Sequence, residues 1–329
     1  MAFDRLRPNG SGGQGVTEQP RIAVLLPCYN EEAAIAQTVA GFRAALPGAA
    51  IHVYDNNSSD RTREVAAAAG AIVRTERMQG KGHVVRRMFA DVEADVYVMA
   101  DGDATYDASA APALVARLVE EQLDMVVGAR RSEVENESYR PGHVLGNRLF
   151  TGLLAGLFGR SFTDIFSGYR VFSRRFVKSF PALSRGFETE TEISVHALEL
   201  AMPVAEVETR YGARPEGSHS KLSTWGDGWR ILKTIIHLYR IERPVLFYGS
   251  FAAFLAALAV VLAIPLALTY FQTGLVPRFP TAILATGLMI LAFLSFFTGL
   301  ILDTVVRGRR EVRRLHYLSL PAPGAEPER

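Results

Sequence analysis

The sequence contains a single cysteine, Cys28, so an internal disulfide is excluded. This usage suits a reducing compartment, where thiols remain unpaired. Cys28 lies at the end of an apolar run, and no base is evident near it in the sequence. We therefore interpret it as a small residue at a strand end and not as a nucleophile.

The sequence also lacks the glycine-rich loops that commonly hold phosphates. Neither GxxxxGKS/T nor GxGxxG follows the first apolar run. A formal net charge of +2 is too small to indicate nucleic-acid binding. A phosphate-bearing ligand would have to be held in another way, and a bound metal ion is the obvious means.

Charged side chains are missing from two long stretches, Pro244–Pro277 and Phe279–Leu302. Each exceeds the roughly 20 residues that a helix needs to cross a bilayer. Pro277-Arg278 makes a short reversal between them, so we predict two antiparallel membrane helices at about 244–271 and 280–303. Two buried core helices are the alternative, although such helices rarely lack charge for so long.

Arginines flank the outer ends of this predicted hairpin. By the positive-inside rule, both ends and the N-terminal domain face the cytoplasm. We expect 307–329 to form a basic cytoplasmic tail. Residues 1–20 are polar and glycine-rich, so we expect disorder and no signal peptide there. The flanking arginines are Arg240, Arg243, Arg307, Arg309, Arg310, Arg313 and Arg314.

Before the hairpin, apolar runs alternate with alanine-rich helical stretches. This alternation predicts an α/β domain at 21–220 with a mostly parallel sheet and helices on both faces. The predicted strands are Ile22–Leu26, Ile51–Tyr54, Ala71–Arg74, Val96–Ala100 and Met125–Ala129. The predicted helices are Glu31–Leu46, Arg61–Ala69, Gly80–Val92 and Ala111–Glu121.

Polar motifs follow three of these strands: PCYNEE the first, DNNSSD the second and DGDATYD the fourth. Ligands of open α/β sheets bind beyond the carboxyl ends of the strands, so we expect one shared crevice. In Asp101-Gly102-Asp103, two carboxylates one residue apart would repel each other without a cation. We expect Asp101 and Asp103 to hold Mg²⁺ or Mn²⁺, with coordination left over for a phosphate.

The motifs PCYNEE, DNNSSDRT, QGKG and DGD, in that order and spacing, resemble family 2 of the glycosyltransferases, which has the GT-A fold. TDIFSGYRVFSRR (Thr163–Arg175), GFETETE (Gly186–Glu192) and YGARPEGSHSKLS (Tyr211–Ser223), followed by membrane helices, narrow the resemblance. They are similar to the polyprenyl-phosphate hexosyltransferases, the group of dolichol-phosphate mannose synthase and bactoprenol glucosyltransferase. The likeness covers roughly Ile22 to Val306.

The resemblance implies a role for each matching residue. It implies a nucleotide-sugar site at Pro27, Tyr29, Glu31, Asp55, Lys81, Asp101, Gly102 and Asp103. It implies that Arg130, Arg148, Arg214, Ser220 and Lys221 contact phosphates, mainly that of the lipid acceptor. Asp103, Arg214 and Lys221 would then carry catalysis. Two positions depart from the family pattern: Asn56 stands where Asp is frequent, and Thr105 where some relatives have Gln.

The expected chemistry is inverting transfer of a hexose from a nucleotide-sugar. A cation on Asp101 and Asp103, helped by Arg214 or Lys221, would neutralise the leaving diphosphate. A lipid phosphate is substantially a dianion at neutral pH, its second pKa being about 6 by analogy with phosphorylated side chains, and needs no general base. A sugar hydroxyl would need one, and Asp164, Glu188 and Glu190 are then the candidates.

Two further segments, 144–160 and 222–243, carry apolar residues at helical spacing with Trp, Tyr and Arg interspersed. This composition is typical of amphipathic helices in a membrane interface, although ordinary core helices are the alternative. We predict such an interfacial helix at 221–243. It would place a polyprenyl phosphate acceptor near the basic residues Arg148, Arg214 and Lys221.

Two rival functions are a processive polysaccharide synthase and a non-catalytic membrane adaptor. A synthase would carry a QxxRW-type motif, but no Gln precedes Trp229-Arg230 at that spacing. An adaptor would have lost the crevice residues, whereas Asp55, Lys81 and Asp101 are present. UDP-hexose is the preferred donor and GDP-mannose the second. The sequence does not reveal the oligomeric state.

Overall fold

The computed structural model describes residues 20–132, 162–184, 186, 188–212 and 239–323, together with 152, 156, 215, 233, 236 and 237. Within these residues, seven strands form one sheet in the order β3-β2-β1-β4-β6-β5-β7. The strands are β1 (Ile22–Cys28), β2 (Ala50–Asp55), β3 (Ile72–Thr75), β4 (Val96–Met99), β5 (Met125–Ser132), β6 (Arg170–Ser173) and β7 (Val204–Tyr211). Only β6 runs antiparallel to its neighbours, β4 and β5, in this sheet.

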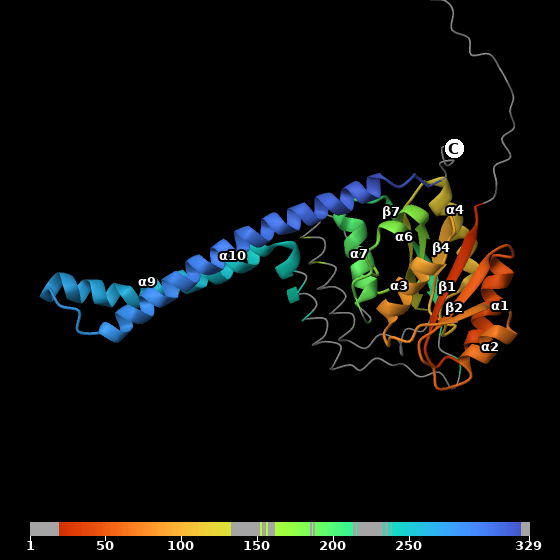
Figure 1. The fold of residues 1–329 in the computed structure, drawn as a ribbon, viewed down its shortest axis with the longest axis horizontal. Helices are drawn as coiled ribbons and strands as arrows, with labels where there is room; N and C mark the ends of the chain where they lie inside the picture. Colours follow the sequence, from red (N-terminus) through yellow and green to blue (C-terminus); the bar gives the residue numbers. More distant parts are fainter. Residues whose placement is uncertain are drawn as a thin grey trace, which may run out of the picture.

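Helices cover both faces of the sheet (Figure 1). Alternate residues of β1 point to opposite faces, as strand geometry requires. Ala23 and Leu25 pack with α3, α6 and α7, whereas Val24 and Leu26 pack with α1, α2 and α4. The helices are α1 (Ile35–Ala45), α2 (Thr62–Ala68), α3 (Lys81–Asp91), α4 (Ala111–Glu120), α6 (Arg174–Ser179) and α7 (Thr189–Glu199), with a 3₁₀ turn at Ala108–Ala110 before α4.

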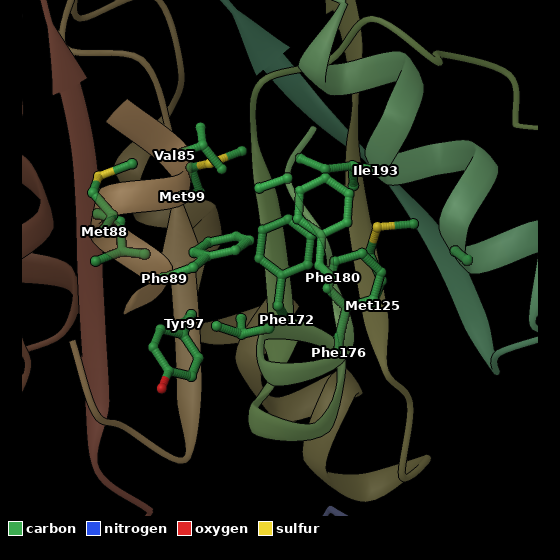
Figure 2. Packing of buried hydrophobic residues seen from close by; sticks show 14 of the residues in the cluster. Val85, Met88, Phe89, Tyr97, Met99, Met125, Phe172, Phe176, Phe180 and Ile193 are labelled. Atoms are coloured by element: carbon green, nitrogen blue, oxygen red, sulfur yellow. The ribbon is translucent and has the colours of Figure 1, made fainter. Parts of the chain in front are cut away.

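Aromatic rings fill the core between the sheet and α3, α6 and α7 (Figure 2). Phe89 of α3 meets Phe172 of β6 edge to face, with ring centroids 5.7 Å apart. Phe172 in turn stacks on Phe176 of α6 at 4.7 Å. Such pairs contribute about 0.5–1.5 kcal/mol each beyond the burial of their area. They fix α3 and α6 against the central strands.

Two long apolar helices, α9 (Pro244–Thr273) and α10 (Phe279–Leu318), pack as a hairpin that projects from the sheet domain (Figure 1). Both are long and apolar enough to cross a membrane, and only 17% of each apolar window is buried. Gly299 makes the close approach between them, since a Cβ there would lie 3.1 Å from Cβ of Tyr248. The apolar side chains outside this contact face outward.

The fold class predicted from the sequence is confirmed: a mostly parallel sheet with helices on both faces, followed by two apolar helices. The five predicted strands correspond to β1–β5 and the four predicted helices to α1–α4. β6 and β7 were missed, because Arg170 interrupts the first apolar run and charged residues interrupt the second. The predicted amphipathic helices, at 144–160 and 221–243, lie mostly outside the described residues.

The second apolar helix differs from the expected span. The sequence predicted a helix at about 280–303 followed by a basic tail, whereas α10 continues without a break to Leu318. Arginine and leucine have high helix propensity, so the change from apolar to basic composition does not end a helix. The start of the expected tail is therefore ordered as part of α10.

Candidate active site

The carboxyl ends of β1, β2 and β4 lie side by side, because these strands are adjacent and parallel. Cys28, at the end of β1, is the register partner of Asp55, at the end of β2. Asp101 and Asp103 follow β4 on the other side of β1. The three polar motifs predicted to share a crevice thus share one edge of the sheet, as open α/β sheets require for a ligand site.

The carboxylate of Asp103 is buried, and a neighbouring threonine orients it. Oδ1 accepts hydrogen bonds from the backbone N–H of Thr105 at 3.2 Å and from its hydroxyl at 2.6 Å. Thr105 stands at the position where some relatives have glutamine, and here it binds Asp103 directly. The hydroxyl of Thr38 in α1 donates to the carbonyl of Gly102 at 3.2 Å. These bonds hold the DGD turn in one conformation.

The glycine between the two carboxylates is required by its surroundings. A Cβ on Gly102 would lie 2.4 Å from Sγ of Cys28, a distance that no side chain could accept. Cys28 is buried and donates from Sγ to the carbonyl of Leu26 at 3.6 Å. The cysteine is therefore a packing residue beneath the DGD turn, in agreement with its sequence interpretation.

Asp55 is fully buried at the end of β2. Its Oδ2 accepts a hydrogen bond from the backbone N–H of Ser58 at 3.2 Å and lies 3.9 Å from Nε of Arg63. Its Oδ1 has no hydrogen-bond donor among the residues that the structure describes. A buried carboxylate oxygen without a donor carries a desolvation cost.

Asn56 has a structural task that an aspartate could not perform. Its amide nitrogen donates to the carbonyls of Glu76 and Met78, at 3.0 and 2.8 Å. Its Oδ1 accepts from the backbone N–H of Gly80 at 2.7 Å. A carboxylate has no hydrogen to donate. The departure from the family pattern therefore fixes the segment that leads to Lys81.

Lys81, the first residue of α3, bridges two carboxylates. Its Nζ lies 2.5 Å from Oδ1 of Asp101 and 2.5 Å from Oε1 of Glu190, in the first turn of α7. Burial opposes the charged ammonium, but the charges of Asp101 and Glu190 outweigh it and hold the pKa of Lys81 above its ordinary value. The lysine stays charged and joins the DGD turn to α7.

The site carries a concentration of negative charge. Burial raises the pKa of the Cys28 thiol, and the charges of Glu31, Asp101, Asp55 and Asp103 raise it further. Carboxylate oxygens are the ligands that Mg²⁺ and Mn²⁺ prefer. Within the described residues, no group of three His, Cys, Asp or Glu side chains is arranged to hold a metal. The assignment of Asp101 and Asp103 as metal ligands therefore stays a prediction.

Arg130, expected to contact phosphate, pairs with Asp164 in this structure. Its Nε and one terminal nitrogen lie 2.7 and 2.8 Å from the two carboxylate oxygens. Its guanidinium also lies 5.5 Å from the centre of the Tyr211 ring. Burial opposes ionisation of Asp164, but the hydrogen bonds and charge of Arg130 prevail, and the pKa lies below its ordinary value. A carboxylate so stabilised is a poor general base.

Sequence reasoning missed the residues that shape the loop after Asp164. Arg170 is fully buried and donates to the carbonyls of Ser167 and Ile165, at 2.9 and 2.6 Å. The hydroxyl of Tyr106 accepts from the backbone N–H of Gly168 at 2.8 Å. Nothing in the residue pattern distinguished Arg170 from an exposed arginine, because its partners are carbonyls of its own loop.

The other predicted site residues divide into two groups. Pro27 and Glu31 are buried beside the strand ends, Tyr29 is 38% exposed, and Glu188 is half-buried just before α7. The backbone N–H of Glu31 donates to the hydroxyl of Thr62 at 2.9 Å, which joins the first motif to α2. The predicted residues Arg148, Arg214, Ser220 and Lys221 lie outside the described residues.

Comparisons with known proteins show the family to which the chain belongs. The family model described as glycosyl transferase family 2 matches residues 23–180. An uncharacterised protein of Shigella flexneri is 57% identical over 153 residues, which are 46% of this chain and 94% of that protein. Glycosyltransferase AglJ of Haloferax volcanii is 34% identical over 230 residues, 70% of this chain and 75% of that protein. Dolichyl-phosphate hexose transferase of the same organism is 28% identical over 222 residues, 68% of this chain and 95% of that protein.

Among solved structures, glucosyl-3-phosphoglycerate synthase of Mycobacterium tuberculosis resembles this chain with a TM-score of 0.53 and 24% identity. The likeness covers 67% of this chain and 80% of that one, and it shows the fold alone. The family match covers β1 to α6, the segment that carries the DGD turn and Asp55. The chain is therefore a glycosyltransferase and belongs to glycosyl transferase family 2.

Proposed function

We propose that this enzyme transfers a hexose, with inversion, from a nucleotide-sugar to a polyprenyl phosphate at the cytoplasmic face of a membrane. One observation carries the proposal: acidic side chains gather at one sheet edge, in a chain that also carries two long apolar helices. The first feature suits a donor with a cation, and the second suits a lipid acceptor.

The donor would lie across the ends of β1, β2 and β4. The buried Oδ1 of Asp55, which lacks a hydrogen-bond donor in the described part of the chain, would accept one from the base of the nucleotide. Pro27, Tyr29 and Glu31 border the same strand end. Lys81 carries the positive charge nearest to Asp101 and would attract a phosphate oxygen.

Asp101 and Asp103 would hold Mg²⁺ or Mn²⁺. A bound cation of this kind stabilises the negative charge that develops on a departing diphosphate. Thr105 orients the carboxylate of Asp103, because its backbone N–H and its hydroxyl both donate to Oδ1. Lys81 holds the other carboxylate, Asp101, so both side chains are positioned before the donor binds.

The acceptor assignment is supported by a relative named dolichyl-phosphate hexose transferase and by α9 and α10. A phosphate dianion needs no general base to attack the sugar. This agrees with two of the three candidate bases, since Asp164 is paired with Arg130 and Glu190 with Lys81. We assign Arg148, Arg214, Ser220 and Lys221 to the acceptor phosphate from the resemblance, and Arg130 if it exchanges Asp164 for that phosphate.

We prefer UDP-hexose as the donor and GDP-mannose as the second choice. The arginines that flank the hairpin support a site on the cytoplasmic side of the membrane. A processive synthase is disfavoured, because the QxxRW-type motif is missing from the sequence. A non-catalytic adaptor is disfavoured as well, because Asp55, Lys81, Asp101 and Asp103 form an intact cluster.

The test is nucleotide release by the full chain in detergent, with a panel of nucleotide-sugars and with or without undecaprenyl phosphate. We expect release that depends on the lipid phosphate and stops when divalent cations are chelated. Asp103→Asn should lower transfer by at least about 100-fold, because it weakens charge stabilisation of the leaving group. Asp107→Asn, in the same loop, should remain active, because asparagine caps the following 3₁₀ turn as aspartate does.

Each rival function predicts a different result in this assay. Release that rises with a growing polymer would support the processive synthase, and no release with any donor would support the adaptor. Undiminished transfer by a folded Asp103→Asn enzyme would overturn the metal assignment. A product that retains the anomeric configuration of the donor would contradict the inverting mechanism.

A further inference from the structure

The cytoplasmic end of α10 leaves the apolar hairpin and docks on the sheet domain. We call Asp303–Leu318 the strut. It continues the helix beyond Leu302 for roughly 24 Å, at 1.5 Å per residue. No glycine pair or proline interrupts it, so the helix connects the hairpin to the sheet domain as one rod (Figure 1).

The first contact of the strut is a pair of buried acids. Glu199, the last residue of α7, and Glu242, just before α9, have side chains only 3% and 6% exposed. Arg313 lies 2.6 Å from Oε2 of Glu199, and Nε of Arg310 lies 3.4 Å from Oε1. Arg310 also donates to the carboxylate of Glu242. One arginine therefore joins the start of the hairpin to the end of α7.

The second contact lies near the tip of the strut. The hydroxyl of Tyr317 donates to Oδ2 of Asp124 at 2.7 Å, and Asp124 is fully buried. Arg175 of α6 pairs with the same carboxylate at 2.8 Å and lies 4.5 Å from the centre of the Tyr317 ring. His316 contacts the carbonyl of Lys178 at 3.1 Å. The strut is thus held at two separate points.

These contacts are expensive to break. Removing one partner of such an ion pair leaves a buried carboxylate without its counter-charge, which is unfavourable. Burial raises the pKa of Glu242, and the charge of Glu199 raises it further, while Arg310 opposes both. Arg310 and Arg313 of the strut are therefore the counter-charges of two neighbouring buried acids.

A single helix, α7, connects these contacts of the strut to the active site. α7 ends at Glu199, which the strut holds, and begins beside Glu190, which pairs with Lys81 next to Asp101. In Figure 1, α7 runs from the strut toward the site edge of the domain. With 11 residues it is about 16 Å long. The strut thus contacts one end of α7, and the other end of α7 contacts the DGD turn through Lys81.

We propose that the strut fixes the orientation of the active site relative to the membrane, and that Arg310 and Arg313 are positioning residues for an acceptor embedded there. The proposal rests on the proposed function, because it presupposes a lipid phosphate acceptor. A rigid mount would restrict the domain to orientations in which its site meets the membrane surface. A domain attached flexibly would sample many unproductive orientations.

A distance measurement tests, without an activity assay, whether the strut holds the sheet domain in one orientation. Cys28 is buried, so spin labels on Ala116→Cys in α4 and Val305→Cys in α10 report one defined distance. We expect a narrow distance distribution in the parent protein and a broad one in the Arg310→Ala/Arg313→Ala variant. The exposed pair Arg309→Ala/Arg314→Ala removes the same charge and should leave the distribution narrow. An unchanged distribution in the Arg310→Ala/Arg313→Ala variant would show that these two arginines do not hold the strut on the sheet domain.

A second variant keeps the contacts of the strut with the sheet domain but interrupts the helix that connects them to the hairpin. Insertion of Gly-Gly-Ser between Val306 and Arg307 leaves Arg310, Arg313 and Tyr317 in place while making the connection flexible. The distribution should broaden here as well, whereas the melting temperature should stay at the parent value. This variant separates a positioning role from simple stabilisation of α7 by its ion pairs.

Two acceptors complete the test: undecaprenyl phosphate in vesicles and a short-chain, water-soluble prenyl phosphate. The insertion should lower transfer to the vesicle acceptor by about tenfold or more and leave transfer to the soluble acceptor unchanged. Arg313→Lys should retain more activity with the vesicle acceptor than Arg313→Ala, because lysine keeps a positive charge beside Glu199. Equal rates with the vesicle acceptor in the insertion variant and the parent would overturn the proposal. A parent protein inactive with both acceptors would instead contradict the proposed function, while the distance distributions would still decide the mount.

Discussion

Individual charged residues of the site are positioned mainly by charges from other elements. Lys81 was predicted to lie near the nucleotide, and the structure places it between Asp101 and Glu190. Glu190 was a candidate base, but its contact with Lys81 gives it a structural partner. The sequence could name these residues, because each stands in a short polar motif. It could not pair them, since Lys81 and Glu190 are far apart in the chain.

A buried histidine makes the stability of the domain depend on pH. Burial and, to a smaller extent, the charge of Arg313 lower the pKa of His196 to about 3. Its ring lies 5.5 Å from Phe176 and from Phe180. Below its unfolded pKa of about 6.5, the unfolded chain binds a proton that the folded chain refuses. This contribution to stability is complete above pH 6.5 and declines as the pH falls toward 3.

We therefore expect His196→Phe to reduce the acid sensitivity of the domain. Phenylalanine keeps the aromatic volume but cannot be protonated. Between pH 7 and pH 5, the parent protein should lose about 2 kcal/mol of unfolding free energy more than the variant. Denaturant unfolding at the two pH values measures the difference. Parallel losses in both proteins would show that His196 is accessible to protons in the folded state.

At the scale of elements, the start of α3 is packed against the segment before α7. A Cβ on Gly82 would lie 2.1 Å from the carbonyl oxygen of Ser184. The resemblance pointed to QGKG as a family motif, but only the tertiary contact explains its second glycine. The close approach allows Lys81 to reach Glu190.

Gly82→Ala should therefore separate α3 from α7 and disturb the site. We expect a loss of about 1–3 kcal/mol in stability from overpacking, together with reduced transfer. Gly308→Ala is the matched control, because Gly308 lies inside α10 with nothing within 4 Å of its Cβ position. That change should stabilise the helix by up to about 1 kcal/mol. A fully active, equally stable Gly82→Ala enzyme would show that the segment around Ser184 moves freely.

At the scale of the whole molecule, we expect the hairpin of α9 and α10 to determine which side of a membrane the site faces. Two engineered thiols test the orientation in intact cells that express the chain: Gln272→Cys at the end of α9 and Glu120→Cys in α4. Both positions are exposed, and the native Cys28 is buried. A membrane-impermeant maleimide should label Gln272→Cys directly and Glu120→Cys only after permeabilisation. Labelling of both without permeabilisation would contradict the cytoplasmic site.

The sequence by itself determined the fold class, because the spacing of apolar runs reports buried strands and amphipathic helices locally. It also determined which motifs meet at one edge, since parallel strands bring their carboxyl ends together. Only the tertiary structure decided the partners of Lys81, the pairing of Arg130 with Asp164 and the docking of the strut on Glu199. Those contacts join segments distant in the chain, and their free energy depends on burial and geometry that no local pattern contains.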